Sequence, residues 1–199
     1  MLDNVYRTTK CFGVNGQGLC KGSFPKGFLS WVKKMGWWGN QRCYLCSGMV
    51  EDSTAFRVDV RPETKPTHLE NATKTSILSS SCDLVVIDPP YTKDLAKTLY
   101  GTEKEFYGIN SFTKEAERIC KDGGLIITLS YEIPKRIKNC DFLAVCGIYT
   151  VPFCGYMRCF TVSKKHLKPI NSKDAINEFV ELQTRLQVLE NHNEKEKVK

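Results

Sequence analysis

The chain has 199 residues, of which 41% are hydrophobic and 26% are charged, which is the composition of a soluble globular chain that buries a full core as one domain. No apolar run reaches the roughly 18 residues that cross a bilayer, and the polar start MLDNVYRTTK is not a signal peptide. We therefore expect a cytoplasmic protein that does not contact a membrane. In that reducing compartment the ten cysteines are expected to be mostly buried free thiols.

The net charge of +7 is unevenly spread along the chain. Residues 1–42 contain seven Lys and Arg against a single acid, and three tryptophans are interleaved with these cations. Cations on phosphates and aromatic rings stacked on bases are typical of nucleic-acid binding. The alternative is that Trp31, Trp37 and Trp38 belong to the core side of a solvated helix. The charge bias favours a nucleic acid as partner.

The predicted elements follow one another in an α/β order. A short amphipathic helix is predicted at 24–36, entered through Pro25. After the fourth strand, helices are predicted at 93–101 and 110–124, the second closed by glycines. A short hairpin around PFCG joins the last two strands. The seven predicted strands are 42–47, 55–60, 67–71, 82–88, 124–131, 142–151 and 156–163. We therefore predict a seven-stranded, mostly parallel α/β sheet that ends in an antiparallel hairpin.

The stretch SSCDLVVIDPPYTKD, residues 81–95, is the most informative motif. Its continuous apolar run, residues 84–87, is typical of a buried strand in a parallel sheet. Proline cannot donate to a sheet ladder, so Pro89 and Pro90 lie past the end of this strand. Asp88 and Tyr91 are therefore expected at the carboxyl edge of the sheet, where open α/β folds bind their ligands.

The order of strand, DPPY, two helices, KDGGLIITLSY and hairpin resembles the catalytic half of the class I S-adenosylmethionine-dependent methyltransferases, which have a Rossmann-like fold. More specifically, it is similar to the DPPY-type DNA adenine-N6 methyltransferases. The upstream FRVDVRPETKPTHLENAT resembles the second and third strands of that fold, and the resemblance covers residues 24–164. It implies that the chain binds S-adenosylmethionine and methylates the N6 amine of a flipped-out adenine in DNA.

The resemblance assigns catalysis to Asp88, Pro89, Pro90 and Tyr91. An exocyclic amine is a poor nucleophile because its lone pair is delocalised into the ring. The Asp88 carboxylate and the Pro89 carbonyl are expected to accept its hydrogens, and Tyr91 is expected to stack on the flipped base. The alternative is that this motif is only a turn, with Asp88 as the cap of the following helix.

The resemblance also assigns the cofactor side of the site. The acid that ends the second strand, Asp59, is expected to accept the ribose hydroxyls together with neighbouring Val60, and Asn71 with Ala72 is expected at the adenine. The first turn contributes Cys46, Ser47 and Gly48, and Asp88 closes this side. Upstream, Lys26 and Phe28 are expected at the methionine end, although Phe28 also fits the hydrophobic face of its helix.

The sequence departs from the plan of the family after the first and second strands. Residues 49–54 are too few for the usual helix, and RPETKPT is too short and too rich in proline for the next one. Two cofactor-side helices are therefore shortened or missing, and one sheet face needs another cover. The candidates are the N-terminal segment, a second copy of the chain, or a C-terminal helix. We divide the chain into a methyltransferase domain, 1–168, whose N-terminal segment is basic, and a C-terminal helix with a frayed tail, 169–199, which either docks on the domain or forms a homodimer.

Target recognition is the least determined part of the sequence. Tyr107 and Arg158 flank the expected base pocket and are expected to contact the target. DNA is the expected target, and RNA base amines or a protein glutamine are alternatives, as is a catalytically silent nucleic-acid-binding subunit. Recognition of the target by a separate subunit is a further alternative. No metal is expected, because Cys43 and Cys46 have zinc spacing without a second close pair.

Overall fold

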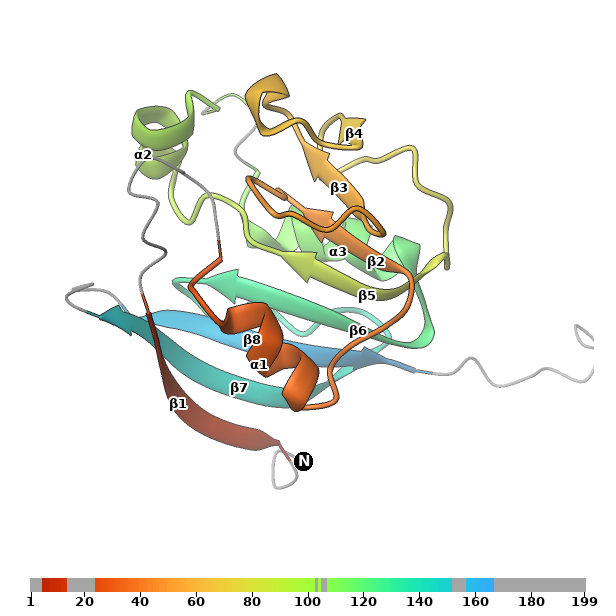
Figure 1. Ribbon diagram of the computed structural model, residues 1–199. Helices are drawn as coiled ribbons and strands as arrows, with labels where there is room; N and C mark the ends of the chain where they lie inside the picture. The colour runs from red at the N-terminus through yellow and green to blue at the C-terminus, as the bar shows by residue number, and fades with distance from the viewer. Residues whose placement is uncertain (1–4, 14–23, 103, 105–106, 152–156, 167–199) are drawn as a thin grey trace, which may run out of the picture. The chain divides into compact units, whose positions relative to one another are not determined.

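The computed structural model describes residues 5–13, 24–102, 104, 107–151 and 157–166, and its strands form one mixed sheet (Figure 1). The sheet order is β1-β7-β8-β6-β5-β2-β3-β4. All neighbouring strands are parallel except where β8 pairs with β6 and β7. The strands are β1 (Tyr6–Gly13), β2 (Arg42–Leu45), β3 (Phe56–Asp59), β4 (His68–Leu69), β5 (Cys82–Ile87), β6 (Cys120–Ser130), β7 (Cys140–Val151) and β8 (Arg158–Lys165). The predicted α/β sheet, mostly parallel and ending in an antiparallel hairpin, is confirmed.

The sheet has one strand more than the seven that the sequence predicted. Strand β1 pairs with β7 in parallel, so that Tyr6 lies opposite Ala144 and Lys10 opposite Ile148. Its sequence YRTTKCFG contains no apolar run, because an edge strand needs few buried side chains. Phe12 is the residue of β1 that reaches the core.

One face of the sheet is covered by helix α1 (Phe28–Lys34) and the residues beside it. Phe28 and Val32 are fully buried on the inner side of this helix. The Phe28 ring packs edge-on against the rings of Phe12 and Phe160, with centroids 5.7 and 5.4 Å away. Trp37 is buried in the same cluster. The N-terminal segment is therefore a cover of the face for which the sequence left three candidates.

The two cofactor-side helices are absent from the described residues, as expected. Residues 46–55 connect β2 to β3 without a helix, and the β3–β4 connection holds only a short 3-10 helix, η1 (Pro62–Thr64). Within the first connection, Val50 and Ala55 pack into the same hydrophobic cluster as α1. The connection thus covers part of the face that a helix would otherwise occupy.

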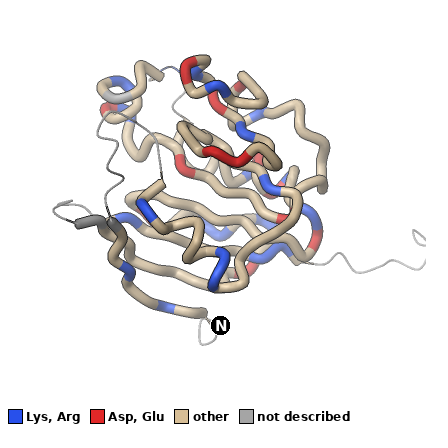
Figure 2. Tube along the Cα trace, viewed as in Figure 1, with Lys and Arg blue, Asp and Glu red and all other residues tan. Residues whose placement is uncertain are grey.

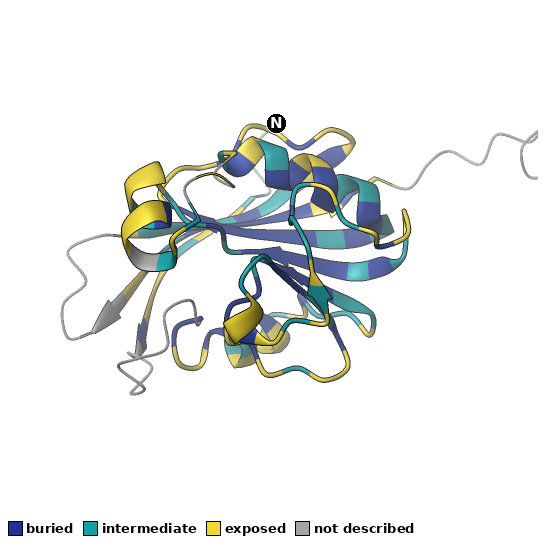
Figure 3. Cartoon of the chain, turned by 90° about the horizontal axis from the view of Figure 1, so that it is seen from above, coloured by how far each residue is buried: buried dark blue, intermediate teal, exposed yellow. Residues whose placement is uncertain are grey.

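The opposite face is covered by helix α3 (Ile109–Ile119), and Figure 3 shows the buried residues of the strands lying between the helices of the two sides. Ile109, Phe112, Ala116 and Ile119 recur at the spacing of one helix face and are buried. Two shorter segments, α2 (Lys93–Leu95) and the π-helical η2 (Ala96–Tyr100), follow β5 and end at Gly101 with φ of 66°.

The end of α3 differs from the sequence prediction, which placed it at the glycines. The helix ends at Ile119, and Cys120 already has extended backbone angles and begins β6. The buried Lys165 ammonium donates to the carbonyl oxygens of Glu117 and Cys120, at 2.7 and 2.8 Å, so a side chain caps this helix end. Gly124 instead lies within β6, where a side chain would not fit. A Cβ there would lie 3.0 Å from the Asp83 carbonyl oxygen and 2.8 Å from the Cys120 sulfur.

Residues 167–199 lie outside the described residues, and so does the predicted C-terminal helix. Within the described part of the chain, no helix is both long and apolar enough to cross a membrane.

Candidate active site

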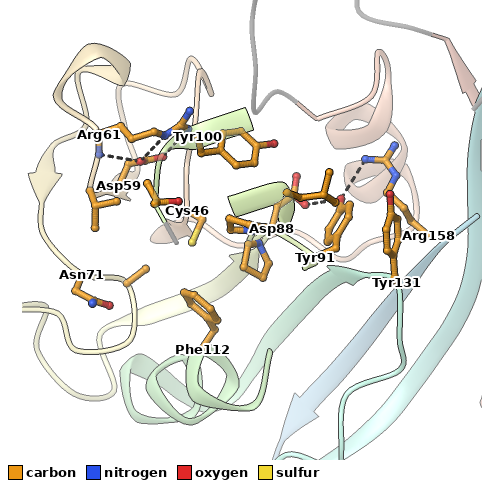
Figure 4. Close-up of a pocket in the computed structure, with 16 residues that line it drawn as sticks. Cys46, Asp59, Arg61, Asn71, Asp88, Tyr91, Tyr100, Phe112, Tyr131 and Arg158 are labelled. Atoms are coloured by element: carbon orange, nitrogen blue, oxygen red, sulfur yellow. Dashed lines mark hydrogen bonds and ion pairs between the residues drawn. The ribbon is translucent and has the colours of Figure 1, made fainter. Parts of the chain in front are cut away.

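A pocket of about 200 Å³ lies at the carboxyl ends of β2, β3, β5 and β6 (Figure 4). Parallel strands deliver their following loops to one edge, so residues distant in sequence meet there. Among the predicted site residues, those that line the pocket are Cys46, Asp59, Val60, Asn71, Ala72, Asp88, Pro89, Pro90, Tyr91 and Arg158. The catalytic and cofactor halves of the prediction therefore share one cavity.

Asp88 directly follows β5 and is one of the two acids, with Asp59, that line this cavity. Strand β5 is buried from Leu84 to Ile87 and is clamped between β2 and β6, which fixes the position of the next residue. The Tyr91 hydroxyl donates to Asp88 Oδ1 at 2.7 Å. Thr92, by contrast, caps the following helix by accepting from the Leu95 N–H. The alternative in which Asp88 serves as the helix cap is thus wrong, because Thr92 has that role.

The electrostatic environment of Asp88 is that of a partly desolvated carboxyl. Burial raises its pKa to about 6, against the opposing effects of the Arg158 charge and of the Tyr91 hydrogen bond. Burial also raises the pKa of the Tyr91 hydroxyl well above its usual value. Tyr91 is therefore a neutral hydrogen-bond donor at physiological pH, and Asp88 is mostly ionised above pH 6.

Tyr131 extends the aromatic side of the pocket and was not predicted. It directly follows β6, and its ring centroid lies 4.6 Å from that of Tyr91 with the planes inclined by 44°. Tyr131 is 37% exposed, so the two tyrosines form the open rim of the cavity rather than its floor. The sequence could have indicated this residue, because Tyr131 directly follows an apolar strand, and Tyr91 lies four residues after the end of another one.

The cofactor half is centred on the buried Asp59 at the end of β3. Its Oδ2 accepts from the Gly48 N–H at 2.8 Å, which ties the first turn to the second strand. Both oxygens also accept from the Arg61 guanidinium, at 3.1 Å each, and Oδ1 accepts from the Arg61 backbone N–H at 3.0 Å. Each oxygen thus holds two donors, and the carboxylate is saturated in this structure.

Arg61 is the second pocket residue that the sequence analysis missed. Its guanidinium lies over the ring of Tyr100 in η2, 4.8 Å from the centroid, while it pairs with Asp59. It stands two residues after the predicted ribose acid, at the same edge of the sheet. The other unpredicted residues that line the pocket are Leu95, Tyr100, Thr102 and Phe112.

Asn71 lines the pocket but uses its amide oxygen locally. Its Oδ1 accepts from the Thr73 N–H at 2.9 Å and from the Thr73 hydroxyl at 2.7 Å. This local turn fixes the loop after β4 and directs Ala72, which is buried, toward the apolar side of the pocket near Phe112. The expected bond from Asn71 Oδ1 to an adenine amine would have to compete with Thr73.

The remaining predicted site residues lie outside the pocket lining. Phe28 is a core residue of α1 with no exposed surface, which matches its alternative role in the hydrophobic face of the helix. Lys26 is exposed ahead of α1, and Tyr107 is 50% exposed. Ser47 is buried beside Cys46, and its hydroxyl has no hydrogen-bond partner within the described residues. Gly48 acts through its backbone N–H on Asp59.

Within the described residues, no group of three or more His, Cys, Asp or Glu side chains is arranged to hold a metal ion. The thiol of Cys46 lines the pocket with a pKa raised well above its usual value by burial. Cys43 is buried in β2, on the side of the sheet that packs against α3.

A comparison with protein-family models finds no match, and a comparison with curated proteins finds none either. Solved structures do show similarity. A SAM-dependent methyltransferase from Methanosarcina mazei is 11% identical, with a TM-score of 0.44 over 68% of this chain and 98% of that chain. The putative methyltransferase yhhF from Escherichia coli is 10% identical, with a TM-score of 0.45 over 72% and 84%. The T. thermophilus 16S rRNA N2 G1207 methyltransferase RsmC, solved with AdoMet and guanosine, is 14% identical, with a TM-score of 0.38 over 66% and 37%. The fold class rests on the strand order of the chain itself.

Proposed function

We propose that the chain transfers a methyl group from S-adenosylmethionine to the exocyclic N6 amine of an adenine flipped out of DNA. The observation that carries this proposal is one pocket whose two halves differ in chemistry. Asp88, Pro89 and Tyr91 line one side at the end of β5, and Asp59 and Ala72 line the other at the ends of β3 and β4. A base and a nucleoside-bearing cofactor would meet between them.

The residues of the cofactor half fit S-adenosylmethionine. A buried carboxylate at the end of the second strand suits ribose hydroxyls, and the apolar surface of Ala72 and Phe112 suits a purine ring. The buried Ser47 hydroxyl without a partner within the described residues suits a polar group of the methionine moiety. When bound, the cofactor supplies an electrophilic methyl group on a sulfonium.

In this proposal the catalytic half of the pocket supplies hydrogen-bond acceptors for the two hydrogens of the amine. Asp88 Oδ1 holds the Tyr91 hydroxyl, which leaves Oδ2 for one amine hydrogen. In this proposal the Pro89 carbonyl accepts the second hydrogen, and the two prolines restrict the turn that carries it. Acceptance of both hydrogens turns the nitrogen lone pair away from the ring and toward the methyl group. The aromatic rim of Tyr91 and Tyr131 supplies a stacking surface for a flipped base.

The charge distribution supports a polyanionic target. Figure 2 shows Lys and Arg along α1, β1 and β8, and these three elements contain seven Lys and Arg and no acid. Residues 40–81, which include β2, β3 and β4, contain five Lys and Arg and five Asp and Glu, so the basic side is that of α1, β1 and β8. A duplex would approach over the basic side, where phosphates are attracted.

The decisive experiment is transfer of labelled methyl from S-adenosylmethionine to unmethylated duplex DNA and, separately, to RNA, followed by nucleoside analysis. The parent is expected to yield N6-methyladenine from DNA, and Asp88→Ala is expected to abolish it. Asp94→Ala is the matched control, because Asp94 is exposed on α2, outside the pocket lining. Label in RNA alone, or in neither nucleic acid despite cofactor binding, would contradict the DNA assignment.

A further inference from the structure

Arg158 lies at the start of β8, 67 residues away from Tyr91 in sequence, and its guanidinium points into the pocket toward the loop after β5 (Figure 4). Its Nη1 donates to the Tyr91 hydroxyl oxygen at 3.2 Å. That hydroxyl in turn donates to Asp88 Oδ1 at 2.7 Å. Because an Arg can only donate and an ionised carboxylate can only accept, the chain of bonds has one direction.

We infer that Arg158 is a positioning residue for catalysis, which acts through the Tyr91 hydroxyl to hold Asp88 as an oriented carboxylate. This inference rests on the proposed function, since it assigns Asp88 as the acceptor of the amine hydrogens. It replaces the sequence expectation for Arg158, which was a direct contact with a phosphate or a base edge.

The orientation argument follows from the occupied oxygen. With Oδ1 bound by Tyr91, rotation of the carboxylate would break a short hydrogen bond, so Oδ2 keeps one direction. The Tyr91 hydroxyl proton is aimed at Asp88 because Arg158 already donates to the oxygen of the same group. The ring of Tyr91 is thereby held both at its hydroxyl and by its inclined contact with the ring of Tyr131.

The charge argument concerns the protonation state of Asp88. The ionisable groups that face it are Tyr91 on its own loop, Cys46 after β2, Tyr100 in η2 and Arg158 in β8. Burial disfavours the Asp88 carboxylate, and the Arg158 charge is the larger of the two effects that favour it. The other pocket guanidinium, on Arg61, is paired with Asp59. A protonated Asp88 would lose acceptor strength at the oxygen that faces the amine.

The test follows the titration of Asp88 itself and needs no turnover. Protein labelled with ¹³C at the aspartate carboxyl carbon is titrated by NMR, and the Asp88 resonance is assigned by its loss in Asp88→Asn. In Arg158→Met the midpoint is expected to rise by roughly one to two units, the effect of losing an opposite charge nearby. In Tyr91→Phe, which keeps the charge but breaks the bond chain, a smaller rise is expected. Arg158→Lys is expected to restore most of the parent midpoint.

Lys164→Met is the matched control, because it removes one positive charge from the exposed side of the same strand. Its Asp88 midpoint is expected to equal that of the parent. The pH profile of methyl transfer is then measured on all variants, and the acid limb of Arg158→Met is expected to move upward with the NMR midpoint. If Arg158→Met fails to fold, the Tyr91→Phe titration decides the matter.

An unchanged Asp88 midpoint in both Arg158→Met and Tyr91→Phe would overturn the inference. A weaker affinity for DNA with an unmoved acid limb would assign Arg158 to direct target contact instead. If the parent transfers no methyl group to DNA, the proposed function fails by itself. The NMR titration would still report whether Arg158 controls the ionisation of Asp88.

Discussion

Burial of Asp88 raises its pKa to about 6. The ionised carboxylate that the proposed reaction needs therefore lowers the stability of the fold at neutral pH. The folded pKa is above the unfolded value, so the folded state favours the protonated acid, and stability is lost as pH rises from about 4 to 6. Asp88→Asn is therefore expected to raise the free energy of unfolding at pH 7.5 by on the order of 1 to 2 kcal/mol while abolishing methyl transfer. Urea unfolding at pH 4 and pH 7.5 measures this, and the gain should nearly vanish at pH 4. A loss of stability at pH 7.5 would contradict it.

At Arg61 the expected change concerns cofactor affinity. The Asp59 carboxylate already holds four donors, so ribose hydroxyls must displace the guanidinium. Arg61→Met is expected to tighten binding of S-adenosylmethionine roughly tenfold, because one charge-assisted pair no longer has to be broken. Calorimetric titration measures the affinity, with the exposed Arg136→Met as the control. Weaker binding in Arg61→Met would show that the guanidinium contacts the cofactor directly.

Most of the residues that the sequence identified in the pocket lie at or just after the ends of predicted strands. Asp59 and Asp88 lie at the ends of the predicted strands 55–60 and 82–88, so their place at the sheet edge was predictable. Arg61 and Phe112 were not, because their role depends on which way a side chain turns after its element. Phe28 shows the converse, since its hydrophobic spacing fitted both a helix core and a cofactor wall, and only packing separates the two.

Among the elements, the connection between β2 and β3 has to stay ordered without a helix. Asp52 organises it: its carboxylate accepts from Arg42 at 2.9 and 3.1 Å, from the Tyr44 hydroxyl at 3.1 Å and from Thr54. The Arg42 guanidinium also lies over the ring of Trp38 at 4.9 Å. Both charged side chains of the pair are largely buried. These hydrogen bonds to the Asp52 side chain keep the connection ordered, as backbone hydrogen bonds would do in a helix.

The network gives a pH-dependent prediction. Burial raises the pKa of Asp52, but the hydrogen bonds from Arg42, Thr54 and Tyr44 outweigh it and lower the pKa to about 2. Its stabilisation is therefore present above the unfolded pKa near 4 and lost as pH falls from about 4 to 2. Asp52→Asn is expected to cost about 2 kcal/mol of unfolding free energy at pH 7. Glu51→Gln, one residue away and exposed, should leave the free energy unchanged.

Urea unfolding at pH 7 and at pH 2.5 separates the Asp52 network from a packing effect. The difference between Asp52→Asn and the parent should shrink strongly at pH 2.5, where the parent Asp52 is partly protonated. A difference that stays constant with pH would assign the effect to side-chain shape rather than to charge.

Helix and strand ends show where local sequence rules give way to tertiary contacts. Two glycines at 123–124 predicted a helix end, yet α3 ends four residues earlier. The Lys165 side chain, more than forty residues later in sequence, caps that end, and no local pattern encodes such a partner. Strand β1 was missed for a related reason, because its place in the sheet comes from β7 rather than from its own polar sequence.

For the molecule as a whole, stability depends on how α1 seals the sheet face that lacks its usual helices. Phe28 has no exposed surface and contacts rings from β1, α1 and β8. Phe28→Ala is expected to lower the free energy of unfolding by about 3 to 5 kcal/mol through the cavity it leaves. Chemical denaturation measures this, and Phe28→Leu should cost clearly less. Equal, small losses in both variants would show that another segment covers this face.

Both edge strands of the sheet are poor templates for pairing with a strand of another molecule. Strand β4 spans only His68–Leu69, and β1 presents the exposed Arg7 and Lys10. A β-ribbon from another chain would have to pair with two residues on one side or approach fixed positive charge on the other. Concentrated solutions of the protein should therefore resist fibril growth by strand addition, and a charge-neutral edge made by Arg7→Val with Lys10→Val would be the variant in which that resistance is lost.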